Sequence, residues 1–545
     1  IKAGDGFARL KKGITDRERS GPERLKPKRE EDLMNREKSA VSRRDFLKQG
    51  AAIGLGILTS GRLAGSAWAA SKERVTILSS SVTDTLNPYN HSGSLIYGMW
   101  QHIFEPLVEV SYNPVRYTGV LAESWEFQGR NWVFRLRKGI RFHDGAPFTA
   151  KDVIFSVNRM RTDKNSLQGT NFNDVVEMQA PDDYTVVFVL KRPNALFLDR
   201  VENRFMISKA AADKYGDETD QHGIGTGAYK FVSFHRGGNF VMTRNEDYWG
   251  AKAEIKEVIF KKVTEDAARV AALESGQADI INNVPVHDVP RLERSPKARV
   301  EKVEGLRMFF LALNPAFKPF DNKLVRQAVN YSVDAPAIVK NIFEGGGFVL
   351  NGPVGANVIG YDPNHKRYPY DPQKSRDLLA KAGYPGGVAV KLYLSSGRFA
   401  RDREVCQVVA AQMEKGGFKV ELVSQEWAIF WGTSGVNGGK LPFYYIGRGS
   451  LVDADTLYDQ YFRTGTSKRV AYSNPEFDKL IEEEQGTADN KKRIALLQQA
   501  GKILMEDVPF VPLYNLADLY GAARNVAWSA RPDEKIFSWE MKIKS

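Results

Sequence analysis

The chain has 545 residues, of which 42% are hydrophobic and 26% are charged, and this composition excludes an intrinsically disordered chain and a membrane-embedded helix bundle. Its length accommodates about two to four domains or one large multi-lobed body. A single cysteine, Cys406, excludes an internal disulfide framework and a cysteine-rich zinc or iron–sulfur centre. The net charge of +12 is concentrated at the front, because residues 1–69 carry 16 Lys and Arg against 9 Asp and Glu, whereas residues 70–545 carry 62 against 57. A nucleic-acid partner is therefore not indicated.

The basic front of the chain, residues 1–69, has the pattern of an export signal. Residues 42–48 read S-R-R-x-F-L-K, which matches the twin-arginine motif. Residues 49–61 are uncharged and too short to span a bilayer, and Ala67-Trp68-Ala69 offers the small-x-small pattern that a signal peptidase cleaves. We therefore expect residues 1–69 to be a leader with a twin-arginine signal peptide, and the mature chain to begin at Ala70 in the periplasm. An amphipathic surface helix is the alternative interpretation of this segment.

The first half of the mature chain alternates strands with helices. Apolar side chains recur at every second position in residues 131–137, which predicts a half-buried strand. Thr149, followed by Asp152, is typical of a capped helix start. Aromatic and apolar residues on both sides of Gly237-Gly238 predict a hairpin. Thr264, followed by two acidic residues, predicts a further helix that this threonine caps.

The second half continues the alternation. Asp371 and the proline after it predict a helix that ends at Gly383. The apolar positions of residues 405–413 follow a helical spacing, Gly416-Gly417 ends that helix, and residues 418–422 alternate as a strand. The repeated strand and helix units predict a mixed α/β protein.

Motifs for catalysis are absent from the sequence. There is no phosphate-binding glycine loop, nucleophile elbow, zinc-binding H-E-x-x-H helix or EF-hand loop. The seven histidines are scattered, which favours surface or hydrogen-bonding roles over a metal site. Cys406 lies within the predicted helix of residues 405–413, where a small buried side chain is expected rather than a nucleophile. We expect no catalytic residue, no metal and no cofactor.

Short blocks spread over the mature chain carry a family resemblance. They are Leu121–Trp125, Phe134–Gly139, Phe142–Gly145, Thr149–Val153, Gly225–Tyr229, Arg244–Gly250, Phe320–Asn322, Val325–Ala328 and Tyr472–Asp478. In their order and composition they resemble the signature of the family 5 extracellular solute-binding proteins, the dipeptide and oligopeptide type that serves ABC importers. These blocks are specific for the fold and not for the substrate.

The resemblance implies an α/β, bilobal periplasmic-binding-protein-like fold of class II, with an extra domain inserted in lobe I. We place the parts at residues 70–102, 200–305 and 513–545 for lobe I, 103–199 for the extra domain and 306–512 for lobe II. The lobes would close by a hinge on a small ligand, a peptide or a peptide-like or anionic conjugate. The partners would be the permease and ATPase subunits of an ABC importer, with no nucleic acid and no reaction catalysed, and we expect a monomer.

The resemblance also suggests where a ligand binds. In peptide-binding relatives an aspartate just before an Asp-x-Asp segment holds the ammonium group of the ligand. Here Asp453-Ala454-Asp455 follows Gly447–Ser450, in which that acid is absent. Arg448 lies between two glycines and suits a carboxylate or phosphate, although a solvated loop arginine is the alternative. The predicted ligand-binding residues are Arg307, Phe309, Trp427, Tyr445, Arg448, Ser450 and Asp453, of which the aromatic ones could equally belong to the core.

Two other functions stay open at this point. The first is an exported cofactor-dependent enzyme, which turnover of a substrate or a bound chromophore would favour. The second is a protein that binds a ligand or a metal and delivers it to a sensor. Only identification of the partner protein would distinguish this function from that of an importer component.

Overall fold

The computed structural model describes residues 73–83, 85–91, 93–234, 238–449, 451–466 and 468–544. The predicted twin-arginine leader lies outside these residues. The described residues belong to one compact unit. Among them, no helix combines the length and the apolar character needed to cross a membrane.

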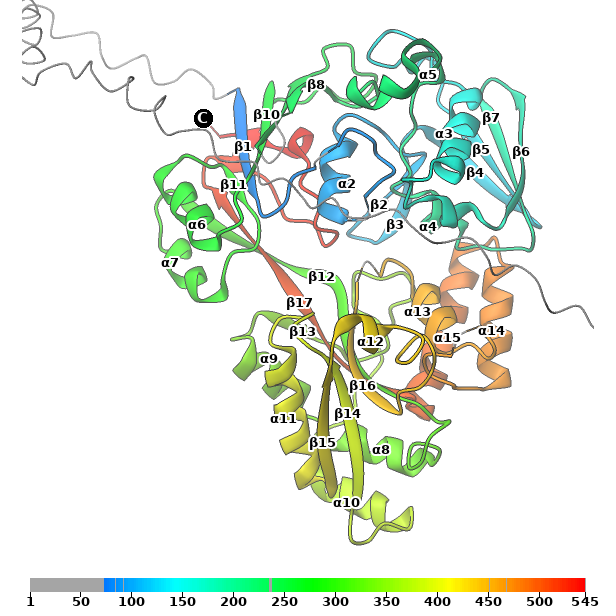
Figure 1. Cartoon of the computed structure of the whole chain (residues 1–545), viewed down its shortest axis with the longest axis vertical. Coiled ribbons are helices and arrows are strands. Elements are labelled where there is room, and N and C mark those ends of the chain that lie inside the picture. The colour runs from blue at the N-terminus through cyan, green and yellow to red at the C-terminus, as the bar shows by residue number, and fades with distance from the viewer. Residues whose placement is uncertain are drawn as a thin grey trace, which may run out of the picture. The chain divides into compact units, whose positions relative to one another are not determined.

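A mixed sheet of eleven strands forms the frame of the described residues (Figure 1). Its path is β15-β14-β16-β12-β17-β11-β1-β10-β9-β8, and β13 pairs with β17 beside this path. The strands are β1 (Arg74–Ser79), β8 (Tyr229–Phe234), β9 (Asn239–Arg244), β10 (Glu257–Lys262), β11 (Ile280–Ile281), β12 (Ala298–Leu313), β13 (Gly347–Val349), β14 (Val388–Ser395), β15 (Phe418–Gln425), β16 (Phe443–Arg448) and β17 (Phe510–Ala523).

Two long antiparallel strands, β12 and β17, connect the two halves of this sheet (Figure 1). The strands β11, β1, β10, β9 and β8 lie on one side of them, and β16, β14 and β15 lie on the other. The register between β12 and β17 shifts between Glu304 and Met308, so residues 305–307 are out of step with the partner strand. Such a bulge bends a strand locally. The predicted crossing from lobe I to lobe II, between residues 305 and 306, falls on this bulge.

Lobe II, predicted at residues 306–512, packs helices around its strands. They are α8 (Lys323–Ser332), α9 (Ala335–Ile342), α10 (Pro372–Lys381), α11 (Asp402–Lys415), α12 (Trp427–Trp431), α13 (Ala454–Tyr461), α14 (Pro475–Gln485) and α15 (Asn490–Asp507). The predicted helix start is confirmed, because the Asp371 side chain accepts the backbone N–H of Lys374 and proline follows it. The predicted αβ unit is also confirmed, since α11 precedes β15, which pairs in parallel with β14. Cys406 is buried on α11.

The lobe I half holds α2 (Ser94–Gln101), α5 (Lys209–Tyr215), α6 (Asp266–Ser275), α7 (Val289–Glu293), β18 (Val526–Ala527) and β19 (Lys542–Ile543). The predicted hairpin is confirmed as β8 and β9, although its glycine turn lies partly outside the described residues. The predicted cap of α6 is wrong by one residue, because Glu265 and not Thr264 is the N-cap. The Arg269 guanidinium donates to the carbonyls of Val263 and Thr264, so this segment stays outside the helix.

A separate antiparallel sheet lies within the predicted extra domain, residues 103–199. Its order is β4-β5-β7-β6, formed by β4 (Ala122–Gln128), β5 (Asn131–Leu136), β6 (Val175–Asp182) and β7 (Thr185–Leu190), and β2 (Val108–Ser111) pairs with β3 (Arg116–Gly119) nearby. The helices are α3 (Ala150–Thr162) and α4 (Phe197–Val201). The capping box of Thr149 and Asp152 is present as predicted. The domain boundaries themselves stay a prediction.

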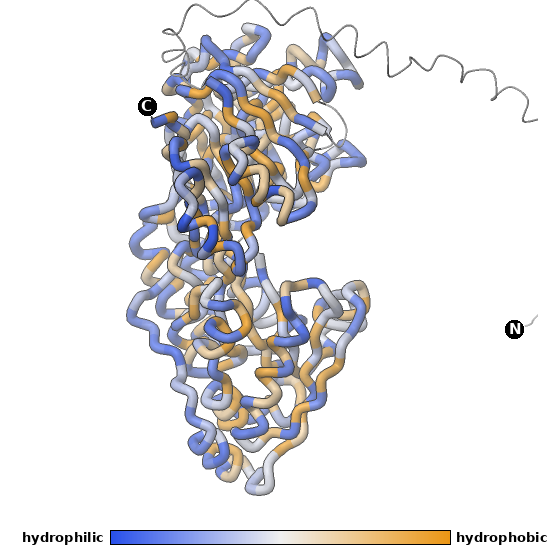
Figure 2. The backbone as a smooth tube through the Cα atoms, turned by 90° about the vertical axis from the view of Figure 1, so that its left-hand side faces the viewer, coloured by the Kyte–Doolittle hydropathy of each residue, from blue (hydrophilic) through white to orange (hydrophobic). Residues whose placement is uncertain are grey.

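Short 3₁₀ helices complete the connections, at η1 (Gly169–Phe172), η2 (Gly216–Gln221), η3 (Val286–Asp288) and η4 (Ser538–Glu540). In Figure 2 the hydrophilic segments run mainly along the outside of each half, and the hydrophobic ones run through it. The largest core cluster gathers around β12, β14 and β16, where Phe310, Leu392 and Tyr444 have no exposed surface. The frame beneath the bulge of β12 is therefore rigidly packed.

Candidate functional site

The bulge of β12 borders a cavity of about 300 Å³. Residues from distant parts of the chain line it, namely Ser94, Tyr97, Tyr112, Leu167, Gln168, Thr170, Asn171, Asp199, Glu202, Asn203, Arg204, Leu306, Val452, Asp533 and Lys535. A small adjacent hollow shares Leu306 and is also lined by Arg307 and Glu534. The predicted extra domain, lobe I and lobe II all contribute to these walls, which makes this the candidate site.

Two arginines of lobe II converge at Gly449. A Cβ atom added to Gly449 would lie 2.7 Å from the guanidinium carbon of Arg307, so the glycine makes room for that side chain. Arg448, at the end of β16, donates from Nη1 to the carbonyl of Gly449. Within the described ranges, neither guanidinium forms an ion pair with a carboxylate. Burial lowers the pKa of both arginines, and neighbouring arginines add to this effect, although Glu534 acts on Arg307, and Tyr461 and Asp199 act on Arg448, in the opposite direction. The pair is therefore suited to an anionic group.

The carboxyl ends of three parallel strands meet at this edge of lobe II. β14, β15 and β16 run in parallel, and Arg398, Trp427 and Arg448 follow or end them in that order. The Trp427 ring is half-buried and stacks on Trp431 at 5.5 Å, while the Arg398 guanidinium lies 5.2 Å from its centroid. Ligands of α/β sheets bind at such strand ends. The sequence analysis missed Arg398 because it did not predict the strand β14 that Arg398 follows.

Other predicted residues lie beneath this surface. Tyr445 has no exposed surface, its hydroxyl shares a hydrogen bond of 2.7 Å with that of Tyr514, and its ring stacks on the buried Phe309 at 5.7 Å. Asp453 is also fully buried, and both of its carboxylate oxygens accept from Arg493, at 2.7 and 3.0 Å. Ser450 lies outside the described residues. The predicted ligand contacts of these four residues stay a prediction.

The opposite wall of the cavity carries charges that neutralise one another. Lys535 lies 3.0 Å from Glu202 and 3.7 Å from Asp533, and Asp533 also pairs with Arg531 at 2.8 Å. Some polar atoms of this wall are buried without a hydrogen bond, including the Tyr112 hydroxyl and Nε of Arg204. Buried polar atoms are nearly always paired in proteins. The unpaired ones indicate a surface that receives water or a ligand.

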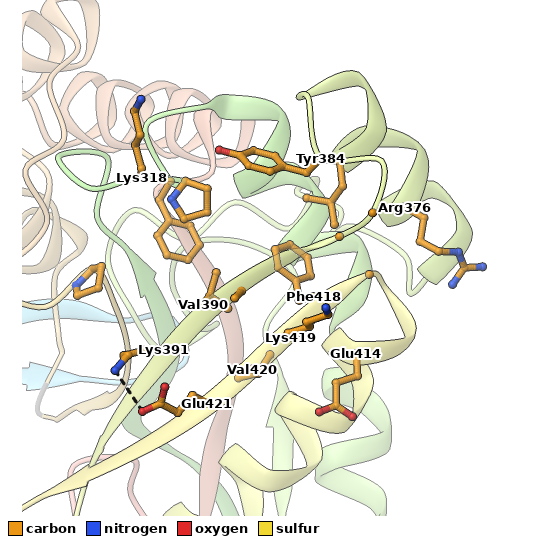
Figure 3. Close-up of a pocket in the computed structure, with 18 of the residues that line it drawn as sticks. Lys318, Arg376, Tyr384, Val390, Lys391, Glu414, Phe418, Lys419, Val420 and Glu421 are labelled. Atoms are coloured by element: carbon orange, nitrogen blue, oxygen red, sulfur yellow. Dashed lines mark ion pairs between the residues drawn. The ribbon is translucent and has the colours of Figure 1, made fainter.

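A larger hollow, of about 950 Å³, lies elsewhere in lobe II, over β14 and β15 (Figure 3). Its charged lining includes an ion pair of 3.2 Å between Lys391 and Glu421, which Figure 3 marks. Arg376, at its rim, donates to the carbonyl of Lys415. This hollow is lined by lobe II alone, whereas the cavity beside Arg307 is lined by all three predicted parts, so the hollow is the weaker candidate. Within the described residues, no group of His, Cys, Asp and Glu side chains is arranged to hold a metal ion.

Comparison with known proteins identifies the family. The model of the bacterial extracellular solute-binding proteins, family 5 (middle region), matches residues 116–469. The chain belongs to this family. The glutathione-binding protein GsiB of Pectobacterium atrosepticum is 29% identical over 469 residues, which cover 83% of this chain and 90% of that protein. Heme-binding protein A of Haemophilus influenzae is 29% identical over 449 residues, which cover 76% and 81%.

Solved structures agree with the family. HbpA2 from Haemophilus parasuis superposes with a TM-score of 0.80 at 26% identity, and the match covers 87% of this chain and all of that one. The binding protein DppA from Helicobacter pylori, in complex with the peptide STSA, gives a TM-score of 0.66 at 26% identity over 87% and 98%. The predicted bilobal α/β fold is thus confirmed. The protein is a solute-binding protein that captures a small ligand between its lobes and delivers it to an ABC importer.

Proposed function

We propose that this protein is exported to the periplasm by the twin-arginine route, captures a peptide-like anionic solute and passes it to the permease and ATPase subunits of an importer. It acts as a monomer and catalyses no reaction. The observation that carries the ligand class is the convergence of Arg307 and Arg448 at Gly449, without an acidic partner among the described residues. The family and the relatives named for glutathione and a peptide support the peptide-like part.

A carboxylate is the ligand group that fits these two arginines best. A guanidinium group donates in a fixed fork that matches a carboxylate or phosphate, and such charge-assisted bonds are strong where water is scarce. Glutathione has two carboxylates and is the first ligand to test. Hemin also carries carboxylates, and the half-buried Trp427 beside Arg398 offers an aromatic surface for a flat group.

Binding can be tested with the mature protein. A panel of glutathione, dipeptides, opine-like conjugates and hemin is screened by thermal melting, because a ligand at a hundredfold excess over its Kd stabilises the folded state by about 2.7 kcal/mol. Each stabilising compound is then titrated by calorimetry against the wild type and Arg448→Ala. Arg161→Ala is the matched control, since the Arg161 side chain is exposed on α3 and does not line the cavity.

We expect at least one anionic compound to bind the wild type and the control equally and Arg448→Ala far more weakly. Equal affinity of all three proteins would remove Arg448 from the site. Conversion of the compound to a product would instead favour the enzyme alternative. Light scattering of the purified protein measures the oligomeric state, and replacement of Arg43 and Arg44 by lysine should retain the precursor in the cytoplasm.

A further inference from the structure

Asp199 is an acidic residue of the cavity wall without a partner. It belongs to α4 in the predicted extra domain and lines the 300 Å³ cavity. Its side chain is half-buried, and no hydrogen bond or ion pair engages its carboxylate within the described ranges. A carboxylate that is partly removed from water without a partner is costly to keep charged. A cation close to Asp199 would therefore stabilise its charged form.

The other charged residues of the same wall do not supply that cation. Lys535 is shared between Glu202 and Asp533, as described above. Arg204 donates to the carbonyl of Asn203, and no carboxylate lies within ion-pair distance of it among the described residues. Arg204 and its neighbour Arg200 attract Asp199 only from farther away. The carboxylate of Asp199 thus remains available to a group that enters the cavity.

The nearest arginine of the anion site is Arg307, which lines the hollow beside this cavity, and that hollow shares Ser94, Leu306 and Asp533 with the cavity. Arg448 meets the Arg307 guanidinium at Gly449. The attraction of Asp199 raises the pKa of Arg448, against the effect of burial, so the two charges act on each other although no ion pair joins them. Among the described residues, an anion without an ion pair (Asp199) and a cation without one (Arg307) thus line the cavity and the hollow that adjoins it. A molecule with separated positive and negative groups would satisfy both at once.

We propose that Asp199 binds a free ammonium group of the ligand, while Arg448 and Arg307 bind a carboxylate at the other end. The substrate class is then a zwitterionic, amino-acid-derived molecule with an unblocked amine. This inference rests on the proposed function, because it takes the two arginines as the anion site. Burial and the nearby acids Glu202 and Asp453 raise the pKa of Asp199 to about 6, and an ammonium group would offset that cost.

The test uses pairs of probes that differ only at the amine. Glutathione, alanyl-glutamate and glycyl-aspartate are each compared with their N-acetylated forms by calorimetry at pH 7.5. The proteins are the wild type, Asp199→Asn, Asp199→Glu and the control Asp144→Asn. Asp144 is exposed and remote from the cavity lining, and asparagine keeps the oxygen that accepts from the Ala146 amide.

We expect the wild type to bind the free amines at least tenfold more tightly than the N-acetylated forms, as for a charge-assisted hydrogen bond. Asp199→Asn should lose this preference and keep its affinity for the N-acetylated forms within about twofold, while Asp199→Glu should retain part of the preference. The control should behave as the wild type. Melting of each unliganded variant confirms that it is folded.

Three outcomes would overturn the inference. Equal binding of both members of each pair by the wild type would show that the amine is not recognised. A uniform loss of affinity for both members in Asp199→Asn would instead indicate that Asp199 pairs with Arg448 when the lobes close. Failure of every probe to bind, in wild type and variants alike, would defeat the proposed function together with this assignment, whereas the first two outcomes leave the anion site intact.

Discussion

Two arginines of lobe II, Arg448 and Arg493, differ in how their charges are compensated. Arg493 is buried on α15, holds Asp453 through two hydrogen bonds and lies 2.8 Å from Glu484. These acids hold the pKa of Arg493 above its ordinary value. Among the residues that the structure describes, Arg448 has only a backbone carbonyl as its partner, and burial lowers its pKa. A compensated buried cation maintains the fold, whereas an uncompensated one at a cavity is free to bind a ligand.

The largest expected effect comes from breaking the compensated network. Arg493→Leu would leave the carboxylates of Asp453 and Glu484 buried without a cation, and loss of one partner of a buried pair typically costs about 3 to 5 kcal/mol. We expect the free energy of unfolding, measured with urea, to fall by this amount. Arg161→Leu on the exposed face of α3 should change it by less than about 0.5 kcal/mol. A similar stability for both variants would contradict the role given to the network.

The next effect concerns affinity instead of stability. Arg448→Ala should weaken binding of an anionic ligand by roughly 2 to 5 kcal/mol, because the ligand charge would stay buried and unpaired. Its unfolding free energy without ligand should change by less than about 1 kcal/mol, since no ion pair is broken. Calorimetry and urea denaturation of the same preparation measure both. If Arg448→Ala lost stability but kept its affinity for the ligand, Arg448 would maintain the fold and not bind the ligand.

The acidity of Asp199 predicts a pH dependence of binding. Its pKa is raised to about 6, so it is charged at pH 7.5 and mostly protonated at pH 5. We expect affinity for a free-amine ligand to fall about tenfold between these values, and affinity for its N-acetylated form to change less. Arg200, Arg204, Arg448, Glu202 and Asp453 also act on this carboxylate, so the comparison with Asp199→Asn isolates its share. If the affinity of Asp199→Asn changed with pH as much as that of the wild type, Asp199 would not be the cause of the pH dependence.

The raised pKa of Asp199 makes stability depend on pH in the opposite direction from ligand affinity. Because burial raises the pKa of Asp199 above that of the unfolded chain, the unliganded protein loses stability as the pH rises through about 6. The contribution is fully present only below the unfolded pKa of the aspartate. In a urea series between pH 4 and 7, the difference between the wild type and Asp199→Asn should therefore change in this window.

The smallest effect tests the space beside Arg307. In Gly449→Ala the new Cβ atom would stand where the Arg307 guanidinium lies, so that side chain must move. We expect affinity for an anionic ligand to fall about fivefold, or about 1 kcal/mol, with little change in stability because the contact is with the end of a flexible side chain. Gly465 has a positive φ, so Gly465→Ala would be strained and is unsuitable as a control. Gly386 is exposed, has a negative φ and has open space where a Cβ atom would lie, so Gly386→Ala is the control. Binding by Gly386→Ala should match the wild type.

Sequence patterns predicted the local structure of the chain better than its site. Helix starts at Thr149 and Asp371 were confirmed because capping depends on a few neighbouring residues. The start of α6 was misplaced by one residue because the side chain of Arg269, on α6 itself, binds the carbonyls of Val263 and Thr264. Asp199 and Arg398 were missed because their surroundings form only when separate parts of the chain fold together. Arg398 follows β14, which pairs with β16 about fifty residues later in the chain, and Asp199 lies on α4 and lines the cavity together with Leu306, more than a hundred residues later.

The bulge of β12 contains Arg307, one of the proposed ligand-binding residues. Arg307 is one of the residues at which β12 leaves register with β17, and these two strands connect the halves of the sheet. A change in the bend of β12 therefore moves the guanidinium, and a carboxylate that holds the guanidinium limits the bend. Binding of a carboxylate to Arg307 and the bend of β12 would therefore be coupled. A permease that recognises the conformation of the protein would then also recognise whether a ligand is bound.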